Sequence, residues 1–372
     1  MVRHAALANF QLPLLEPHDA SLQKCVYCPK LSRAACPISN VEANETVTPW
    51  GKMSMAFFAA RGDVPIDRVH ADPAWACSAC YACRERCDHR NEVATVLTDA
   101  RADLFARGVA PAGAQKVASR WPAKAAEAAR STRELSGETP GAGAVAVLIG
   151  CGYIRRAPEV ARDALRATAA LVGGRVRAVE ACCGLPWLYA GDREAFAAAA
   201  RRLQAEVSSA PRLVAVDPGC ARAVLVEYRR LGVPVIEPEL FVDVALAQAG
   251  RLRRLGAGAT GSAEVRYHDP CQLGRGLGRF DPPRELIERI TGAAPREFLY
   301  RREHAVCSGA GGILPATRPE TSRTMADERI AEHRARGGGT LVTACAGSLH
   351  RFRSRGEPAA DLVTLVSRAL EV

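Results

Sequence analysis

Long hydrophobic runs are absent from this sequence. No segment reaches the roughly 18 to 20 uncharged apolar residues that a membrane-spanning helix needs, and residues 1–11 lack the basic stretch and long apolar core of an export signal. We therefore expect a cytoplasmic protein. The 372 residues are 48% hydrophobic and 24% charged, so the chain is long and apolar enough to bury two or three cores.

Lysine and aromatic residues are scarce. Aromatic residues make up 5% of the chain, and nearly all basic residues are arginines, with lysine only at Lys24, Lys30, Lys52, Lys116 and Lys124. The net charge of +10 is spread over segments rich in Ala, Glu and Asp, and no basic run is interleaved with aromatic residues as in a nucleic-acid-binding surface. We expect no nucleic-acid partner; the charge suits an anionic membrane surface or the compensation of anionic clusters.

Nucleotide-binding loops and hydrolytic residues are also missing. Gly274-Arg275-Gly276 and Gly309–Gly312 are glycine-rich, but neither has the Lys-Ser/Thr of a phosphate loop or the G-x-G-x-x-G that opens a helix after a first strand. No nucleophile stands with a base outside the cysteines. His268 and His304 lie near cysteines, where we expect them to be polar neighbours rather than ligands.

Cysteine, in contrast, is abundant. The chain has 14 cysteines, and in a reducing compartment cysteines serve metals or redox chemistry rather than disulfides. The most specific motif is the C-x2-C-x2-C-x3-C run of Cys77, Cys80, Cys83 and Cys87. This is ferredoxin spacing, in which three thiolates surround one iron–sulfur cube and the fourth reaches a neighbouring cube. A zinc site usually needs two separated C-x-x-C pairs, so the run favours a cluster.

A second, incomplete motif precedes this run and consists of Cys25, Cys28 and Cys36. If the two motifs exchange their fourth ligands, Cys36 completes one four-cysteine set with Cys77, Cys80 and Cys83. The other set, Cys25, Cys28 and Cys87, is one ligand short because Ser32 stands where the ferredoxin pattern has a cysteine. That site is a three-iron cluster, a cube with a serine or solvent ligand, or a decayed remnant.

The pattern changes after residue 143. Six short β-branched runs alternate with amphipathic helices, which indicates an open α/β sheet; they are Val145–Ile149, Val176–Val179, Leu213–Val216, Val233–Ile236, Val265–Tyr267 and Thr340–Thr343. Six cysteines each follow one of these strands and precede a helix: Cys151, Cys182, Cys183, Cys220, Cys271 and Cys345. The carboxyl edge of such a sheet binds ligands, and helix N-termini there stabilise anions.

This region also repeats internally. Cys151, Cys182 and Cys220 correspond in order to Cys271, Cys307 and Cys345. Cys182 and Cys220 are separated by 38 residues, as are Cys307 and Cys345. We therefore predict a duplicated domain.

These motifs together resemble a known family. Cys182-Cys183-Gly184, His268-Asp269-Pro270-Cys271 and Cys307-Ser308-Gly309, with the ferredoxin-like part in front, resemble the cysteine-rich "CCG" domain proteins over about residues 25–370. The family includes heterodisulfide reductase subunits and the iron–sulfur subunits of glycolate oxidase, anaerobic glycerol-3-phosphate dehydrogenase and lactate-utilisation systems. The resemblance implies a flavoprotein dehydrogenase as electron donor and a membrane quinone as acceptor.

The sequence departs from the family pattern at three positions. Each half of the family pattern has a cysteine, a Cys-Cys-Gly and a C-x-x-C, but Ala223, Ser308 and Ser348 replace cysteines here. The first half keeps four thiolates, enough for one four-iron cluster. The second half keeps three, which are either buried small hydrophobes or an incomplete or shared cluster site. The losses disfavour disulfide-cleaving chemistry.

These observations predict an α-helical ferredoxin-like N-terminal domain followed by a duplicated α/β domain with cysteines at the carboxyl edge of the strands. The expected parts are a lead-in (1–24), a helical ferredoxin domain (25–110), a linker (111–143) and two cysteine-rich domains (144–250 and 262–372), the second degenerate. We expect two to three [4Fe-4S] clusters, one of them [3Fe-4S] or absent, ligated by the 14 cysteines.

The expected function is electron relay from an FAD-dependent dehydrogenase of the glycolate, lactate or glycerol-3-phosphate type to a quinone or other acceptor, on the inner face of the membrane. One alternative is a heterodisulfide-reductase-like thiol–disulfide enzyme. Another is a zinc-binding structural or nucleic-acid-binding protein.

Overall fold

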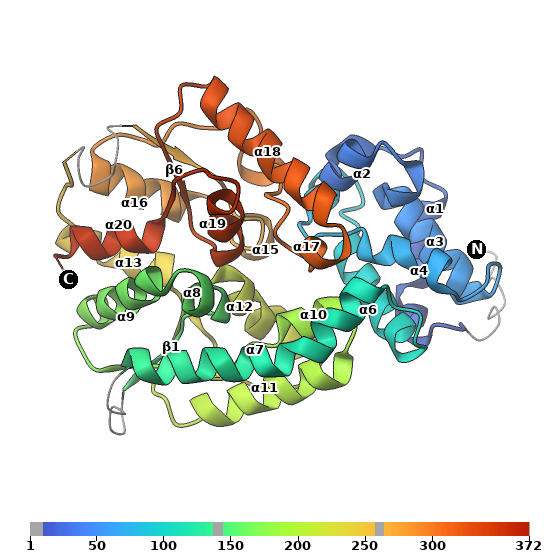
Figure 1. Ribbon diagram of the computed structural model, residues 1–372, viewed down its shortest axis with the longest axis horizontal. Coiled ribbons are helices and arrows are strands. Elements are labelled where there is room, and N and C mark those ends of the chain that lie inside the picture. The colour runs from blue at the N-terminus through green and yellow to red at the C-terminus, as the bar shows by residue number, and fades with distance from the viewer. Residues whose placement is uncertain (1–9, 137–143, 257–263, 372) are drawn as a thin grey trace. The chain divides into compact units, whose positions relative to one another are not determined.

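The computed structural model describes residues 10–136, 144–256 and 264–371 (Figure 1). The chain forms two compact units. Unit 1 consists of residues 1–119, 186–193 and 310–325, and unit 2 of residues 120–185, 194–309 and 326–372. Within the described residues, no helix combines the length and the apolar character needed to cross a membrane.

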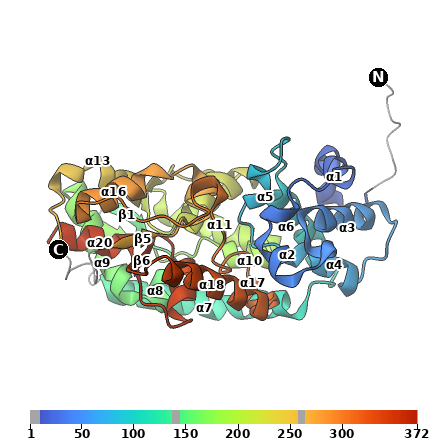
Figure 2. The same cartoon turned by 90° about the horizontal axis from the view of Figure 1, so that it is seen from above.

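Unit 1 is helical. Its helices are α1 (Asp19–Val26), α2 (Pro37–Glu42), α3 (Pro49–Arg61), α4 (Arg68–Trp75), α5 (Ala82–Glu85) and α6 (Val93–Ala106), and α3 packs against α1, α4 and α6 (Figures 1 and 2). The Thr48 side chain accepts a hydrogen bond from Gly51 N and begins α3, and Gly62, in the left-handed region with φ 81°, ends it. Buried side chains of α3, α4 and α6 form the core: Met53, Phe57, Trp75 and Leu97.

Two segments that follow the Cys-Cys-Gly and Cys-Ser-Gly motifs belong to unit 1, although the sequence pattern assigns them to the cysteine-rich domains. One holds α10 (Leu185–Ala190), where Tyr189 O accepts a hydrogen bond from Arg101. The other holds α17 (Leu314–Thr317) and the start of α18 (Pro319–Ala335), where Arg318 pairs with Glu42 and Asp72. These contacts join residues far apart in the sequence, so the hydrophobic periodicity of neighbouring residues does not predict them.

The backbone of Gly311 and Gly312 lies directly on the cysteine run. A Cβ atom at Gly312 would lie 2.4 Å from Cys77 O and 2.7 Å from Ser78 Cα, and φ at Gly312 is +60°. Glycine is needed here because both the close approach and the left-handed backbone exclude a side chain. This glycine-rich stretch, which carries no phosphate-loop signature, is therefore a packing element of unit 1.

Unit 2 contains two parallel sheets. The first has the strand order β2-β1-β3-β4, made of β1 (Val145–Leu148), β2 (Val176–Ala178), β3 (Leu213–Ala215) and β4 (Glu239–Leu240). The second has the order β5-β6-β7, made of β5 (Val265–Tyr267), β6 (Thr340–Thr343) and β7 (Ala359–Asp361). In register, Val147 pairs with Ala178 on one side and Val214 on the other. Five of the six expected strands are present to within one residue.

The prediction of the sixth strand is wrong. Val233–Ile236 forms no strand, and the fourth strand of the sheet begins only at Glu239. Pro234 and Pro238 lack the N–H that a sheet ladder requires, which displaces the strand. β7 was not anticipated, because its residues, Ala359–Asp361, include no β-branched side chain.

Helices surround both sheets of unit 2. They are α8 (Cys151–Arg156), α9 (Pro158–Val172), α11 (Arg193–Val207), α12 (Pro218–Arg222), α13 (Phe241–Ala247), α15 (Gly274–Leu277), α16 (Asp281–Thr291), α19 (Ala346–Arg353) and α20 (Leu362–Ala369). Most of the expected linker is also helical, as α7 (Ala112–Ser136), because its alanine-rich sequence has high helix propensity. Residues 137–143 of that linker lie outside the described residues.

Buried polar bonds join the two repeats inside unit 2. α20 packs along α9 (Figure 1), and Tyr153 donates a hydrogen bond of 2.7 Å to Asp361. Burial raises the pKa of Asp361 to about 7. Ala346 N of the second repeat donates to Asp217 of the first, at 3.1 Å. The repeats therefore share one interior.

We predict that Gly312→Ala destabilises unit 1 by about 2 to 5 kcal/mol, because the methyl group adds overpacking against backbone to left-handed strain. Gly108→Ala is the matched control: Gly108 also belongs to unit 1 and has φ +74°, but nothing lies within 4 Å of its Cβ position. The control should lose only about 1 kcal/mol. Urea unfolding followed by circular dichroism measures both, and equal losses would contradict the packing role.

Candidate metal centres

Four cysteines converge in unit 1 on a pocket that we call pocket A, lined by Cys36, Cys77, Cys80 and Cys83. Cys36 caps the N-terminus of α2, and the other three lie in the loop from α4 into α5. Ala79 and Tyr81, on either side of Cys80, have left-handed backbone conformations with φ of 53° and 61°, so the chain turns sharply within the cysteine run. The structure thus brings together the set that exchange of fourth ligands predicts, although Cys36 is 41 residues from Cys77 in the sequence.

The electrostatics of pocket A suit an anion. Lys52 Nζ lies 3.3 Å from Cys36 Sγ. Burial alone would lower the pKa of Lys52, but the charges of Cys36 and Cys77 and the hydrogen bond to Cys36 raise it overall. Burial raises the pKa of the Cys77 and Cys83 thiols, with Lys52 opposing it. Four thiols around a buried ammonium group fit a [4Fe-4S] cluster, whose bound form is anionic.

Pocket B, also in unit 1, is lined by Cys25, Cys28, Cys87 and Ser32, with Cys83 shared with pocket A. Asn91 donates a hydrogen bond of 3.1 Å to Cys25 Sγ. Burial raises the pKa of Cys25 to about 11, and the Asn91 bond partly offsets it. Ser32 therefore lies where the sequence predicts the missing thiolate. Two apolar side chains at this pocket are exposed: Tyr27 (77%) and Leu31 (61%).

Pocket C lies in unit 2 and is lined by Cys151, Cys182, Cys183 and Cys220. Cys151 begins α8 after β1, the pair follows β2, and Cys220 lies in α12 after β3, so parallel strands bring all four to one edge of the sheet. Sγ of Cys183 is 3.1 Å from that of Cys220, and Sγ of Cys151 is 4.0 Å from that of Cys182. The four thiols fit one further cluster.

A tryptophan contacts pocket C from the expected linker. Trp121 Nε1, on α7, donates a hydrogen bond of 3.4 Å to Cys182 Sγ, and Gly184 N donates at 3.5 Å. The Cys182 sulfur accepts hydrogen bonds from the Cys151 and Cys183 thiols and from these two N–H groups. Together they lower the pKa of Cys182, although burial opposes this shift. No sequence motif indicates Trp121, because its contact spans 61 residues.

In the second repeat, serines occupy two positions at which the family pattern has cysteines, and their hydroxyl groups form a pair. Ser308 Oγ and Ser348 Oγ, both buried, are 2.9 Å apart and share a hydrogen bond. Cys307 Sγ accepts from Gly309 N at 3.4 Å, as Cys182 does from Gly184 N. Burial raises the pKa of Cys345 to about 12. The backbone of the motif is kept, while the two serines hydrogen bond to each other.

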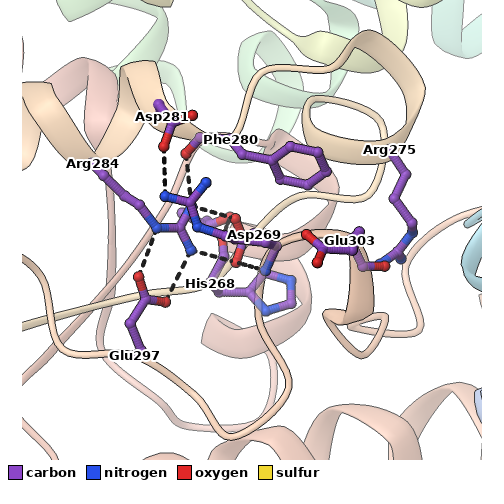
Figure 3. Close-up of polar contacts among 10 residues, drawn as sticks. His268, Asp269, Arg275, Phe280, Asp281, Arg284, Glu297 and Glu303 are labelled. Carbon is purple, nitrogen blue, oxygen red and sulfur yellow. Dashed lines mark hydrogen bonds and ion pairs between the residues drawn. The ribbon is translucent and has the colours of Figure 1, made fainter. Parts of the chain in front are cut away.

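An arginine holds the start of the second repeat in place (Figure 3). Arg284 forms two hydrogen bonds to Asp269, of 2.7 and 2.8 Å, and two to Glu297, of 2.6 and 2.9 Å. These two carboxylates raise the pKa of Arg284 although burial opposes it. Asp269 immediately precedes Pro270-Cys271, so this bidentate network fixes the Cys271 loop. The sequence contains no indication of it.

The two histidines considered from the sequence lie in different surroundings. His268 is buried with its ring edge against Phe352, and burial lowers its pKa. His304 is partly exposed beside Glu303. In the described part of the chain, no group of three or more His, Cys, Asp or Glu side chains is arranged to hold a single metal ion.

Comparison with known proteins agrees with these sites. The cysteine-rich domain family, CCG, matches residues 145–224 and again residues 265–353. The 4Fe-4S dicluster domain matches residues 21–91, which hold pockets A and B. The chain therefore carries two cysteine-rich CCG domains and one 4Fe-4S dicluster domain. These matches support several [4Fe-4S] clusters as its cofactors.

Several proteins similar to this chain are named as oxidoreductases or as their subunits. It is 24% identical over 350 residues to one of the subunits of the fumarate reductase (CoM/CoB) from Methanothermobacter marburgensis, covering 89% of this chain and 68% of that protein. It is 28% identical over 204 residues to one of the subunits of the dihydromethanophenazine:CoB–CoM heterodisulfide reductase from Methanosarcina barkeri. This match covers 51% of this chain and 50% of that protein. It is 30% identical over 121 residues to a probable iron–sulfur-binding oxidoreductase, FadF, of Bacillus subtilis. This match covers 32% of this chain and 17% of that protein. The matches to the second and third relatives thus span half of those proteins or less.

We predict that Ser32→Cys gives pocket B a fourth thiolate and hence a complete four-iron cluster. Any three-iron signal in the electron paramagnetic resonance (EPR) spectrum of the oxidised protein should disappear, and both sites of unit 1 should give four-iron signals when reduced. Ser32→Ala, which supplies no ligand, is the control. Spectra of Ser32→Cys that match those of Ser32→Ala would show that position 32 supplies no ligand.

We predict that Trp121→Phe makes the cluster of pocket C harder to reduce, because a hydrogen bond to sulfur stabilises the more negative, reduced state. A bond of about 1 kcal/mol corresponds to roughly 40 mV for a one-electron couple. An EPR-monitored redox titration measures the shift. Signals from unit 1 should keep their midpoints, and an unchanged pocket C midpoint would exclude the Trp121 bond as an influence.

Proposed function

We propose that this chain is the iron–sulfur electron-transfer subunit of an oxidoreductase, relaying electrons from an FAD-dependent dehydrogenase of a small hydroxy acid or polyol phosphate to a quinone or other acceptor. The observation that carries the proposal is the continuity of pockets A and B, because Cys83 lines both. Consecutive thiols of one cysteine run therefore serve neighbouring sites. The oxidoreductase names of the relatives agree with it.

The ligands that we propose are the four cysteines each of pockets A and C and, in pocket B, Cys25, Cys28 and Cys87. Bound clusters would supply one-electron redox chemistry. The chain's own residues bury the thiols, exclude water from Cys36 and Cys80, and donate hydrogen bonds to sulfur from Lys52, Asn91 and Trp121. Such burial and hydrogen bonding set the reduction potential of a cluster.

A cytoplasmic place on the inner face of a membrane fits the same proposal. The net charge of +10 favours contact with anionic lipid headgroups. Such contact would bring the protein to a membrane quinone.

A second function, thiol–disulfide reduction, is favoured by one observation. Pocket C retains a Cys182-Cys183 pair with Cys151 and Cys220, in a chain that has relatives named as subunits of a heterodisulfide reductase. The Ser308–Ser348 pair disfavours the same chemistry in the second repeat.

We predict about eight or more irons per chain, with acid-labile sulfide, in anaerobically purified protein. After reduction with dithionite, the protein should be reoxidised by a water-soluble quinone and not by a small disulfide. Absorbance and EPR follow both reactions. Reoxidation by the disulfide alone would favour the second function, and zinc without sulfide would overturn both in favour of a structural zinc protein.

A further inference from the structure

Lys52 is a buried charge without a carboxylate partner. It lies in α3, whose inward-facing residues are otherwise largely apolar, and it is 2% exposed. No carboxylate oxygen of the described residues lies within 4 Å of its amine, whose polar contact is Cys36 Sγ at 3.3 Å. Burying an uncompensated ammonium group costs several kcal/mol. The negative charge that balances it has to come from the sulfur ligands of pocket A.

A second buried cation contacts the backbone of one of these cysteines, Cys77. Arg101 is 1% exposed and donates to three backbone carbonyls: Cys77 O at 2.6 Å, Ala74 O at 2.9 Å and Tyr189 O at 3.3 Å. Its charge, like that of Lys52, acts on Cys77. Carbonyl groups satisfy its hydrogen-bonding capacity but cancel none of its net charge. One buried positive charge thus lines pocket A, and a second lies behind the backbone of Cys77.

Pocket B is treated differently. The side chain that donates to its sulfur is the neutral amide of Asn91, and Lys24, the lysine in its lining, is exposed to solvent. Water and salt screen an exposed charge far more than a buried one. The field at pocket B is therefore much less positive than that at pocket A, although the two share Cys83.

We infer that Lys52, supported by Arg101, is the fixed counter-charge of the cluster in pocket A and makes this site the first in unit 1 to accept an electron. Reduction adds one negative charge to a cluster, and a buried cation nearby stabilises the added charge. Electrons that enter unit 1 then rest in pocket A rather than in pocket B. The inference depends on the proposed electron-transfer function and adds the order in which its sites fill.

The test is a redox titration of the full chain, purified without air and followed by EPR. Signals are assigned with Cys36→Ser for pocket A and Cys25→Ser for pocket B. In the wild-type protein, the pocket A signal should appear at the higher potential. Lys52→Gln keeps a hydrogen-bond donor but removes the charge, and should lower the equilibrium constant for reduction of pocket A at least tenfold, which is 59 mV for a one-electron couple.

Two further variants separate charge from structure. Lys52→Arg keeps the charge and should stay near the wild-type midpoint, while Lys24→Gln removes an exposed charge beside pocket B and should shift neither signal appreciably. If Lys52→Gln fails to assemble its clusters, the inference is still tested by the order of the two midpoint potentials in the wild-type protein and by the midpoint of Lys52→Arg. Pocket B reduced before pocket A, or a Lys52→Gln protein with intact clusters and unchanged midpoints, would overturn the inference. Absence of iron and sulfide from the wild-type protein would instead overturn the proposed function.

Discussion

The need to compensate buried negative charge shapes the three cysteine pockets A, B and C. A thiol buried in an apolar interior resists ionisation, as the raised pKa values of Cys25, Cys77 and Cys83 reflect. A cluster ligand has to be a thiolate, so the surrounding chain supplies positive charge or hydrogen-bond donors. Each pocket does so differently: pocket A with Lys52, pocket B with Asn91 and pocket C with Trp121 and Gly184.

The duplicated half shows what happens to such a site when ligands are lost. The first repeat keeps four thiols at one sheet edge. In the second, Ser308 and Ser348 hydrogen bond to each other, so two buried hydroxyl groups are satisfied without a metal. The loop of Cys271 is fixed by Arg284 and Asp269. An internal polar network thus occupies part of the second repeat, which is why the ligands that we propose lie in pockets A, B and C and do not include Cys271, Cys307 and Cys345.

Much of the architecture followed from the sequence because it depends on local signals. Short β-branched strands and the spacing of the cysteines are properties of neighbouring residues, and five strands and the helical N-terminal part were correctly predicted. A local signal was wrong where Pro234 and Pro238 interrupt a β-branched run, and the helix α7 within the expected linker was not predicted. Cysteine spacing even predicted that Cys36 joins Cys77, Cys80 and Cys83.

By itself, then, the sequence determined which residues are candidate ligands, their distribution over an N-terminal and a duplicated part, and the missing ligand at Ser32. Only the tertiary structure decided what faces those ligands. Lys52 is one polar residue in an apolar helix, and Trp121 is part of an expected linker, until folding places each beside a sulfur atom. Potentials depend on such through-space contacts, which fall off with distance in space and not with separation along the chain.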